Sequence, residues 1–600
     1  MTVTGETVDP RGEYNRRLED RKKRASDEER RQRVTGNVRV GVVLLVLALG
    51  YPILVSGQLG VGWLALPVIL FIGVSIVHDR VTRAWQRAAR AVEFYEQGLA
   101  RLEDRWAGRG KSGDRFLNTS HPYALDLDLF GTGSLFELLC TAQTSAGQET
   151  LANWLLQPAS AKEIEARQRA VDELRSRLDL REEIAQLGAD VPEGTDLHGL
   201  AAWGDAPPVM LRPRVRILAS VLGGAAILTL IGWGFLHWSA SPFLVIVFLE
   251  ALFAVSLRAR VTKVINPVEQ RGPDLLLLAG LLSWLERERF TSPKLLELQQ
   301  KLVIAGVPPS LRLGNLARLL DWLDARRNAF FAPFAALLLW TTQMAFAVER
   351  WRGRTGPAIE RWVHLVGEFE ALSALATYAY ENASDPFPEI AADGPCFNAE
   401  AVGHPLIPRK TCVMNDVNLG GDLRLLVISG SNMSGKSTLL RTVGVNAVLA
   451  LAGAPVRARR LKLSPLAVGA TLRIQDSLRE GKSRFYAEIV RVRQLVDLAR
   501  GPLPLLFLLD EVFQGTNSHD RRLGAEAVVS GLVKVGAIGL ITTHDLALTH
   551  IAEHLGPRGA NVHFEDHFEN GSMTFDYRMR EGVVQKSNAL ALMRAVGLDV

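Results

Sequence analysis

The segment Gly430-Ser-Asn-Met-Ser-Gly-Lys-Ser437 places the strongest constraint on what this chain can fold into. It follows the apolar run Leu425–Ile428 and fits G-x-x-x-x-G-K-[ST], the pattern of a loop between a buried strand and a helix. The backbone N–H groups of such a loop cradle phosphates, and the helix that begins near its end adds a positive dipole. The sequence therefore predicts a nucleotide site made of Gly430, Ser431, Asn432, Met433, Ser434, Gly435, Lys436, Ser437 and Thr438.

A second strand supports this interpretation. The apolar run that ends in Asp510 and Glu511 is typical of the strand that holds a magnesium site beside such a loop. We expect Lys436 to reach the β- and γ-phosphates of ATP, and Ser437 and Asp510 to hold Mg²⁺. Glu511 is predicted to orient and deprotonate the attacking water. The alternative, ordinary buried strands flanked by loops, does not explain why both elements occur in this order.

Two further polar elements accompany this site. Ser483 stands two residues after Gly481 and just before a helical stretch, where backbone N–H groups and a hydroxyl form another anion-binding terminus. In ATPases whose heads dimerise, such an element closes over the γ-phosphate held by the partner, although a capped surface helix has the same pattern. His544 ends a short strand and is predicted to sense the γ-phosphate, although a lone histidine is more often structural. The predicted catalytic residues are Glu511, Lys436, His544 and Ser483.

The hydrophobicity of the chain is high for a soluble enzyme, with 48% hydrophobic residues and a mean hydropathy of +0.10. The excess lies in two pairs of apolar runs, 38–55 with 59–77 and 217–238 with 242–257. Each run approaches the ~20 residues that cross ~30 Å of hydrocarbon. Neutral turns join the runs of each pair and basic residues flank both pairs, so the large segments are predicted to lie in the cytoplasm. We therefore expect two transmembrane hairpins in the cytoplasmic membrane.

Buried core helices are the alternative for these runs, mainly because Glu250 lies inside the fourth one. A glutamate within a membrane needs a partner or a functional role.

A fifth apolar stretch, 329–348, is predicted to be a buried cytoplasmic helix, because a crossing there would place the nucleotide site outside the cell. The polar residues before the first run do not resemble a cleavable signal peptide. The cysteines Cys140, Cys396 and Cys412 lack the spacing of a disulfide framework or a zinc site.

The order of elements predicts an α/β P-loop domain at the C-terminus, preceded by an all-α core that the hairpins interrupt. Helical periodicity dominates before residue 385, and strands alternate with helices after it, as in a parallel sheet with crossover helices. The predicted segments are a charged, mobile or partly helical N-terminal segment (1–37), hairpin 1 (38–77), an amphipathic helical linker (78–119), the first part of the core (120–211), hairpin 2 (212–258), the second part of the core (259–384) and the nucleotide-binding domain (385–600).

The chain resembles the MutS family of DNA mismatch-repair ATPases in an ordered set of motifs: the phosphate loop with Asn432 and Met433, the block 481–488, Asp510-Glu511 with Gly515-Thr516, and Thr543-His544. Further similar segments are Gly403–Leu406, Asn415-Asp416, 577–597 and parts of 131–171. The resemblance covers about 120–200 and 365–600 and implies an ABC-type ATPase domain. It also implies a homodimer with composite sites, in which Ser483 acts across the interface, and coupling of the nucleotide state to clamping on mismatched or branched DNA.

The chain also departs from the family. We find no room before residue 120 for the domain that reads mismatches. That domain inserts an aromatic-x-Glu motif into DNA as a wedge. Phe94-Tyr-Glu96 matches this pattern, but it lies in a polar helical stretch, and we do not interpret it as a wedge. The insertion that forms the DNA clamp is expected to be absent, its place near 210–260 being taken by the second hairpin. Cys412 stands where an aromatic side chain commonly stacks on adenine. ATP use is therefore better supported than mismatch recognition.

The predicted function is that of a membrane-anchored, homodimeric MutS-like ATPase that couples Mg-ATP binding and hydrolysis to DNA binding, in DNA mismatch repair or recognition of aberrant DNA structure. A net charge of +5 is compatible with contact with DNA or anionic lipid and requires neither. One alternative is an ATP-driven scaffold that regulates a membrane partner without DNA, because the candidate DNA-facing residues Arg326, Arg327 and Arg350 are typical of any solvated face. Another is an ABC-type transporter. The short crossings disfavour it, and the sequence around Ser483 lacks the Leu-Ser-Gly-Gly-Gln motif that is usual in transporter ATPase domains.

Overall fold

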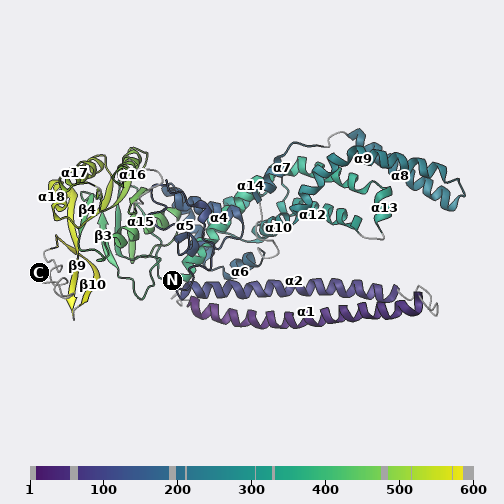
Figure 1. Ribbon diagram of the computed structural model, residues 1–600, viewed down its shortest axis with the longest axis horizontal. Helices are drawn as coiled ribbons and strands as arrows, with labels where there is room; N and C mark the ends of the chain where they lie inside the picture. Colours follow the sequence, from purple (N-terminus) through teal and green to yellow (C-terminus); the bar gives the residue numbers. More distant parts are fainter. Residues whose placement is uncertain are drawn as a thin grey trace.

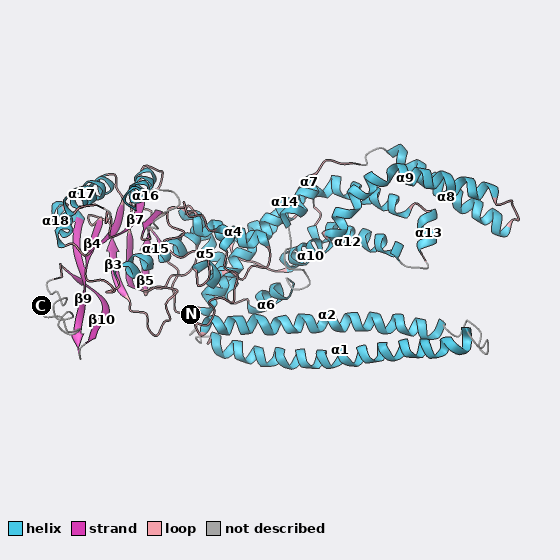
Figure 2. Cartoon of the chain, in the orientation of Figure 1, coloured by secondary structure: helices cyan, strands magenta, loops and turns pink. Residues whose placement is uncertain are grey.

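The computed structural model describes residues 9–54, 65–187, 197–209, 213–304, 306–327, 331–473, 484–514, 516–569 and 572–584. Figure 1 shows three parts in a row: an α/β head, a helical core and two long helical arms that leave the core on the side away from the head. The long helix α14 (Trp340–Glu381) runs from the arms to the head. The helical and sheet-containing parts are thus separated along the molecule, as Figure 2 also shows.

The head contains two sheets. A six-stranded sheet has the order β10-β9-β4-β8-β7-β6 and is parallel except for the antiparallel pair β9–β10. A second sheet has the order β1-β5-β2-β3 and is mixed, which differs from the single parallel sheet expected after residue 385. The strands are β1 (Glu389–Ile390), β2 (Phe397–Val402), β3 (Asn415–Leu419), β4 (Leu425–Ser429), β5 (Arg460–Leu463), β6 (Ala467–Thr471), β7 (Leu505–Asp510), β8 (Ile538–Thr543), β9 (Gly559–Glu569) and β10 (Ser572–Glu581).

Helices cover both faces of the six-stranded sheet, which explains why its central strands are continuously apolar. In β7, Leu505, Phe507 and Leu509 belong to one buried cluster, together with residues of α16, α17 and α18. Leu506 and Leu508 point to the opposite face, into the cluster that includes α15. These helices are α15 (Lys436–Ala452), α16 (Arg484–Leu498), α17 (Ser518–Lys534) and α18 (His550–His554).

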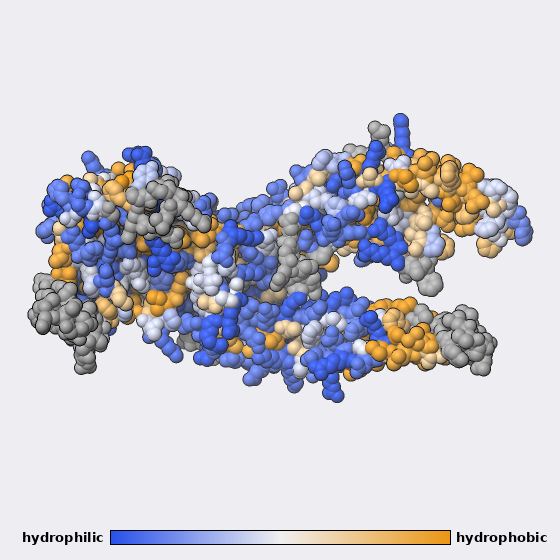
Figure 3. Space-filling model, in the orientation of Figure 1, coloured by the Kyte–Doolittle hydropathy of each residue, from blue (hydrophilic) through white to orange (hydrophobic). Residues whose placement is uncertain are grey.

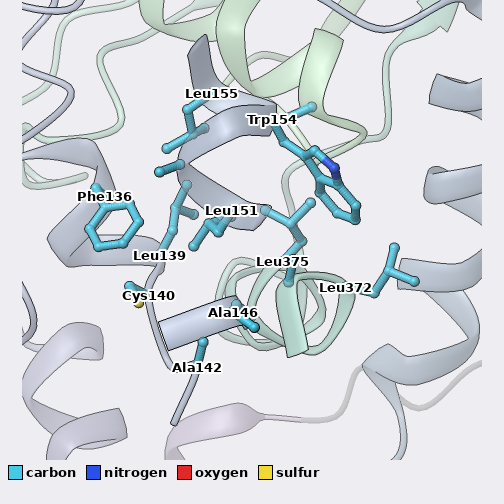
Figure 4. Packing of buried hydrophobic residues seen from close by; sticks show 14 of the residues in the cluster. Phe136, Leu139, Cys140, Ala142, Ala146, Leu151, Trp154, Leu155, Leu372 and Leu375 are labelled. Carbon is cyan, nitrogen blue, oxygen red and sulfur yellow. The ribbon is translucent and has the colours of Figure 1, made fainter. Parts of the chain in front are cut away.

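The helical core packs around α14. Figure 4 shows α3, α4 and α14 meeting through Phe136, Leu139, Leu151, Leu155, Leu372 and Leu375, all of which are buried. The core helices are α3 (Leu135–Leu139), α4 (Ser145–Leu156), α5 (Ala161–Arg175), α6 (Leu178–Leu187), α7 (Leu197–Asp205), α10 (Gly272–Arg287), α11 (Pro293–Leu302) and α12 (Pro309–Asp324). The same buried cluster extends into the head, so head and core share one hydrophobic interior.

The two arms are antiparallel helical hairpins with apolar ends. One consists of α1 (Pro10–Leu54) and α2 (Ala65–Leu102), and the other of α8 (Pro213–Phe235) and α9 (Ser241–Gln270). Among the described residues, three helical segments are long and apolar enough to cross a membrane, namely Pro10–Leu49, α8 and α9. In Figure 3 the hydrophobic surface of both arms gathers toward their far ends. Large side chains there are exposed, for example Leu47 at 66%, Leu66 at 70% and Phe248 at 69%.

Several segment boundaries that we drew from composition fall inside continuous helices. Position 37/38 lies within α1, position 77/78 within α2 and position 258/259 within α9. The charged residues from Pro10 on are therefore part of the same helix as the first apolar run, whereas residues 1–8 lie outside the described part. A change from polar to apolar side chains alters what surrounds a helix without breaking its backbone hydrogen bonds.

The fifth apolar stretch is divided between two helices. Its described part forms α13 (Ala332–Leu337) and the start of α14, with Leu339 in the left-handed conformation between them (φ 46°). Ala345 and Val348 are buried, whereas Phe334 is 57% exposed. The single buried helix that we expected over 329–348 is thus wrong in its continuity.

A buried cluster holds the base of the first arm against the core. Tyr14, Phe94, Tyr95 and Tyr380 pack together in it. Phe94 and Tyr95 are therefore interior residues of the arm–core junction, which agrees with our rejection of Phe94-Tyr-Glu96 as a DNA wedge. Beside them, Arg101 donates two hydrogen bonds of 2.7 Å to the carboxylate of Glu381, at the end of α14.

Candidate nucleotide-binding site

The predicted site residues meet where three neighbouring parallel strands end. The phosphate loop follows β4, Asp510 ends β7 and His544 follows β8, which lies between those two strands. Carboxyl ends of parallel strands lie at the same edge of a sheet, where ligands of open α/β sheets commonly bind. The sheet topology thus brings together residues that are more than 100 positions apart in the sequence.

The phosphate loop holds its shape through backbone geometry and internal hydrogen bonds. Gly430 (φ 151°), Met433 (φ 68°) and Gly435 (φ 103°) have positive φ angles. The Ser434 hydroxyl donates to the Ser431 carbonyl at 2.8 Å. Gly430, Ser431 and Ser434 shape the loop in this way, whereas Asn432, Met433, Gly435, Lys436, Ser437 and Thr438 line a cavity of about 500 Å³.

Lys436 is the buried cation of the site. It is 5% exposed, and its Nζ donates to the carbonyls of Gly430 (2.8 Å) and Ser431 (2.7 Å). Its Nζ also lies 3.8 Å from Oε1 of Glu511. Burial lowers the pKa of Lys436, and the carboxylates of Glu511 and Asp510 oppose that shift. A phosphate group offers this ammonium stronger acceptors than neutral carbonyl oxygens do.

Neighbouring polar groups orient the two carboxylates. The Thr542 hydroxyl donates to Oδ1 of Asp510 from the adjacent strand β8. Glu511 stands just past the strand with φ 48°, and its backbone N–H donates to the Thr542 side chain at 3.2 Å. Its Oε2 accepts a hydrogen bond from Gln514 and lies 3.3 Å from Nδ1 of His544. The structure therefore brings together Lys436, Asp510, Glu511 and His544, as predicted.

An aromatic side chain that sequence reasoning did not assign also lines the cavity. Tyr577 comes from β10, where the pairing with β9 shifts register between Phe575 and Met579. A methyl group added to Gly435 would lie 3.1 Å from its ring, so the ring lies against the phosphate loop. Cys412, at the place where we expected an aromatic residue in relatives, lines the same cavity. The aromatic surface here is thus supplied by the C-terminal hairpin.

Comparison with protein families agrees with this architecture. The family model for MutS domain V matches residues 426–599, and that for MutS domain III matches residues 121–222. The chain belongs to the MutS family. The second match ends inside α8, so the resemblance to domain III extends into the second arm.

Individual relatives match less than half of the length of this MutS-family chain. It is 33% identical over 251 residues to "DNA mismatch repair protein MutS 2" of Halobacterium salinarum, which covers 41% of this chain and 29% of the relative. It is 34% identical over 208 residues to "Endonuclease MutS2" of Thermomicrobium roseum, covering 33% and 25%. The matches thus span less than a third of either relative, and activities named for those proteins are considered below as proposals.

Replacing Tyr577 with alanine is expected to weaken ATP binding by roughly 5- to 150-fold, because stacking of one base on an aromatic ring contributes about 1–3 kcal/mol. Titration of the purified MutS-family protein with a fluorescent ATP analogue measures this. Tyr577→Phe retains the ring and should bind as the parent does. Equal affinity of Tyr577→Ala and the parent would exclude base stacking on this side chain.

His404 lines the same cavity and is held neutral. Burial, together with the positive charges of Arg441 and Arg457, lowers its pKa from 6.5 to about 4. Its Nδ1 accepts a hydrogen bond from the backbone N–H of Leu406 at 3.2 Å, which requires an unprotonated Nδ1. Between about pH 4 and pH 6.5, His404 is therefore unprotonated in the folded head and protonated in the unfolded chain.

This difference predicts acid lability. The unfolded chain takes up a proton at His404 near pH 6.5 and the folded chain does so near pH 4, so stability falls as the pH drops through that window. The loss is at most about 3 kcal/mol. Melting temperatures of the parent and His404→Gln between pH 7.5 and 4.5 should converge as the pH falls.

Ser483 lies outside the described residues, as do residues 474–482. The segment before it is fixed to the core by Asp126, whose Oδ1 accepts hydrogen bonds of 2.8 Å from the N–H groups of Leu472 and Arg473. Oδ2 of the same carboxylate pairs with Arg491 of α16, the helix that follows Ser483 in the sequence. Asp126 is fully buried and was not identified from the sequence, because its partners lie more than 340 positions away.

The residues present fit a magnesium nucleotide. The hydroxyl oxygen of Ser431 is buried without a hydrogen-bond partner among the described residues. Those residues contain no group of three or more His, Cys, Asp or Glu side chains that could hold a metal ion alone. Mg²⁺ commonly takes one or two protein ligands and completes its shell with phosphates and water. Ser437 and Asp510 are the side chains that would hold it, and the ion would neutralise phosphate charge.

Proposed function

We propose that this protein is a membrane-anchored ATPase of the MutS family, which hydrolyses Mg-ATP as a homodimer and couples the nucleotide state to DNA binding. The observation that carries the ATPase part is that Lys436 and Glu511 line one cavity beside the phosphate loop, with His544 3.3 Å from Glu511 and Asp510 directly before Glu511 at the end of β7. Steady-state ATP hydrolysis by the purified chain, with and without Mg²⁺, tests it. Absence of Mg-dependent turnover would refute it.

The side chains divide the work of hydrolysis between them. Lys436 stabilises the negative charge that develops on the phosphates, and Glu511 accepts a proton from the attacking water. His544, beside Glu511, donates a hydrogen bond toward the γ-phosphate and so responds to its loss. Thr542 and Gln514 keep the two carboxylates in position through the hydrogen bonds described above.

Membrane anchoring is supported by the surface of the two arms. Both arms point away from the head, and large apolar side chains at their far ends are exposed (Figure 3). Exposed apolar patches of this extent are unusual on soluble monomers. The proposed location is the cytoplasmic membrane, with the head in the cytoplasm. Retention of the full chain in membranes after carbonate extraction is expected, and release into the soluble fraction would contradict it.

Within the proposed anchor, Glu250 of α9 is 4% exposed. Its Oε1 has no hydrogen-bond partner among the described residues. This arrangement agrees with the expectation that a glutamate in such a run needs a partner. We propose that a second subunit supplies the partner, since the described residues of one chain leave the oxygen unsatisfied.

A mixing experiment tests the composite sites. Ser483→Ala and Lys436→Met should each depress hydrolysis. In a mixed dimer, the Lys436→Met subunit supplies an intact Ser483 to the intact phosphate loop of the other subunit, so one functional site is restored. We expect mixing to recover up to about a quarter of parental turnover, since half of the dimers are mixed and each has one intact site. No recovery from subunits shown to exchange would exclude sites shared between subunits.

DNA binding is tested with homoduplex, mismatched and branched DNA, with and without ATP, across salt concentrations. Binding through phosphate contacts weakens steeply as salt rises. We expect salt-dependent retention of DNA that changes with the nucleotide. DNA retention that is absent at every salt concentration would leave the ATPase proposal standing and exclude its coupling to DNA.

One structural observation favours a second candidate, an ATP-driven scaffold that regulates a membrane partner without DNA. Arg326 and Arg327, two of the candidate DNA-facing residues, lie 2.7 and 3.5 Å from the carboxylate of Glu269. Their charges are thus partly neutralised within the chain. The DNA experiment separates the two candidates directly.

A further inference from the structure

A second cavity, of about 680 Å³, lies where the first arm meets the core. Its walls come from α2, the segment 109–115, the start of α4, α6 and α14. None of its described lining residues borders the nucleotide cavity. Volumes of 300–1,000 Å³ are typical of small-molecule sites. This cavity is therefore separate from the ATP site and large enough for a ligand of nucleotide size.

Basic side chains dominate the lining. Six of them border the cavity against two carboxylates, Glu93 and Glu370; they are Arg90, Arg101, Arg109, Lys111, Arg115 and Arg181. Arg101 is neutralised by its ion pair with Glu381. The carboxylate of Glu370 is occupied by hydrogen bonds from the backbone N–H groups of Gln143 and Thr144. An excess of positive charge thus faces the cavity.

Arg181 carries the strongest indication of a missing ligand. It is 3% exposed, and its Nη1 donates to the Ala376 carbonyl at 2.7 Å. Its Nε and Nη2 have no hydrogen-bond partner among the described residues, and neither has the hydroxyl of Ser145, which also lines the cavity. Leaving donors of a buried charged group unsatisfied is costly. An anion in the cavity would accept these hydrogen bonds.

We infer that this cavity binds a phosphorylated small molecule of nucleotide size. Guanidinium groups match phosphate oxygens in pairs, and the clustered arginines here favour a ligand with more than one phosphate charge. Arg90 lies 13 residues beyond Val77, the end of the apolar run, which corresponds to roughly 20 Å along α2. A lipid headgroup at the membrane surface does not reach that far, so the ligand is a soluble anion.

The inferred ligand would connect the arm to the core. Arg90 belongs to α2, whereas Arg181 and Ser145 belong to α6 and α4 of the core. A bound anion that contacts both sides stiffens this junction, in addition to the ion pair between Arg101 and Glu381. Binding of a soluble phosphorylated compound would thereby reduce the movement of the first arm relative to the core.

The test uses the detergent-solubilised full chain with Lys436→Met, so that the nucleotide site does not take up the probe. Inorganic pyrophosphate is titrated by calorimetry at low salt, and short-chain phosphatidic acid is titrated in parallel. We expect saturable binding of pyrophosphate with one site per chain. Combined replacement of Arg109 and Lys111 by alanine should weaken binding at least tenfold, whereas Arg105→Ala, an exposed arginine outside the lining, should not change it.

Arg181→Met provides a second measurement. It removes a buried charge whose Nε and Nη2 lack hydrogen-bond partners among the described residues, and it keeps an apolar stem against the Tyr380 ring. Pyrophosphate binding should therefore be lost while the melting temperature without ligand stays the same or rises. Absence of saturable pyrophosphate binding would overturn the inference, as would binding that Arg109 and Lys111 do not affect. Binding of the lipid alone would overturn the assignment to a soluble ligand. Because the background lacks Lys436, these outcomes do not depend on ATP hydrolysis.

Discussion

Replacing Glu511 with glutamine is expected to leave ATP binding intact and to lower the turnover number by about 10²- to 10⁴-fold. Glutamine has nearly the same shape as glutamate and retains an oxygen that can accept the hydrogen bond from Gln514. It cannot accept a proton from the attacking water. The change therefore removes general-base catalysis while preserving the geometry of the cavity.

Steady-state hydrolysis and nucleotide affinity, measured on the same preparation, separate these effects. Glu553→Gln is a matched control, because Glu553 is an exposed glutamate of α18 that pairs with His550 away from the cavity. The control should hydrolyse ATP at the parental rate. Unchanged turnover in Glu511→Gln would refute the role of Glu511 as the base.

Replacing Lys436 with methionine is expected to weaken ATP binding by roughly 30- to 4,000-fold, since loss of a buried charged hydrogen-bond partner costs about 2–5 kcal/mol. The buried Nζ holds two carbonyls of the phosphate loop and lies near Glu511. Methionine fills a similar volume without a charge or donor. The phosphates would then lose their closest cation, and the Glu511 carboxylate would lose its positive neighbour.

Fluorescence titration with an ATP analogue measures this loss. Lys462→Met is the matched control, because the Lys462 side chain on β5 is 44% exposed and pairs with Glu389 at 2.6 Å. It should bind the analogue as the parent does. Parental affinity in Lys436→Met would show that the loop does not use this lysine to hold phosphates.

Much of the candidate site could be predicted because its parts follow apolar strands directly. The strands before Gly430, Asp510 and His544 are buried on both faces, so their sequences are continuously apolar and their ends are easy to locate. Parallel pairing then places these ends together. Local sequence and one topological rule are enough for this part of the site.

Other parts depend on pairing that no local pattern specifies. Tyr577 reaches the cavity through a register shift between β9 and β10, and Asp126 contacts segments far along the chain. The mixed sheet of β1, β2, β3 and β5 was missed because its strands are short and half polar. The continuity of α1, α2 and α9 was not predicted for a different reason. A change from polar to apolar side chains reflects a change in what surrounds the helix, and it does not mark where the helix ends.

The unbroken course of α9 has a mechanical consequence. Its 30 residues span about 45 Å, from the apolar tip of the second arm to buried positions such as Val264 and Val268 in the core. A rod of this kind transmits tilt in either direction. With the tip anchored as proposed, closure of the heads on ATP would lean this helix in the bilayer, and a thicker or thinner bilayer would in turn favour or resist closure.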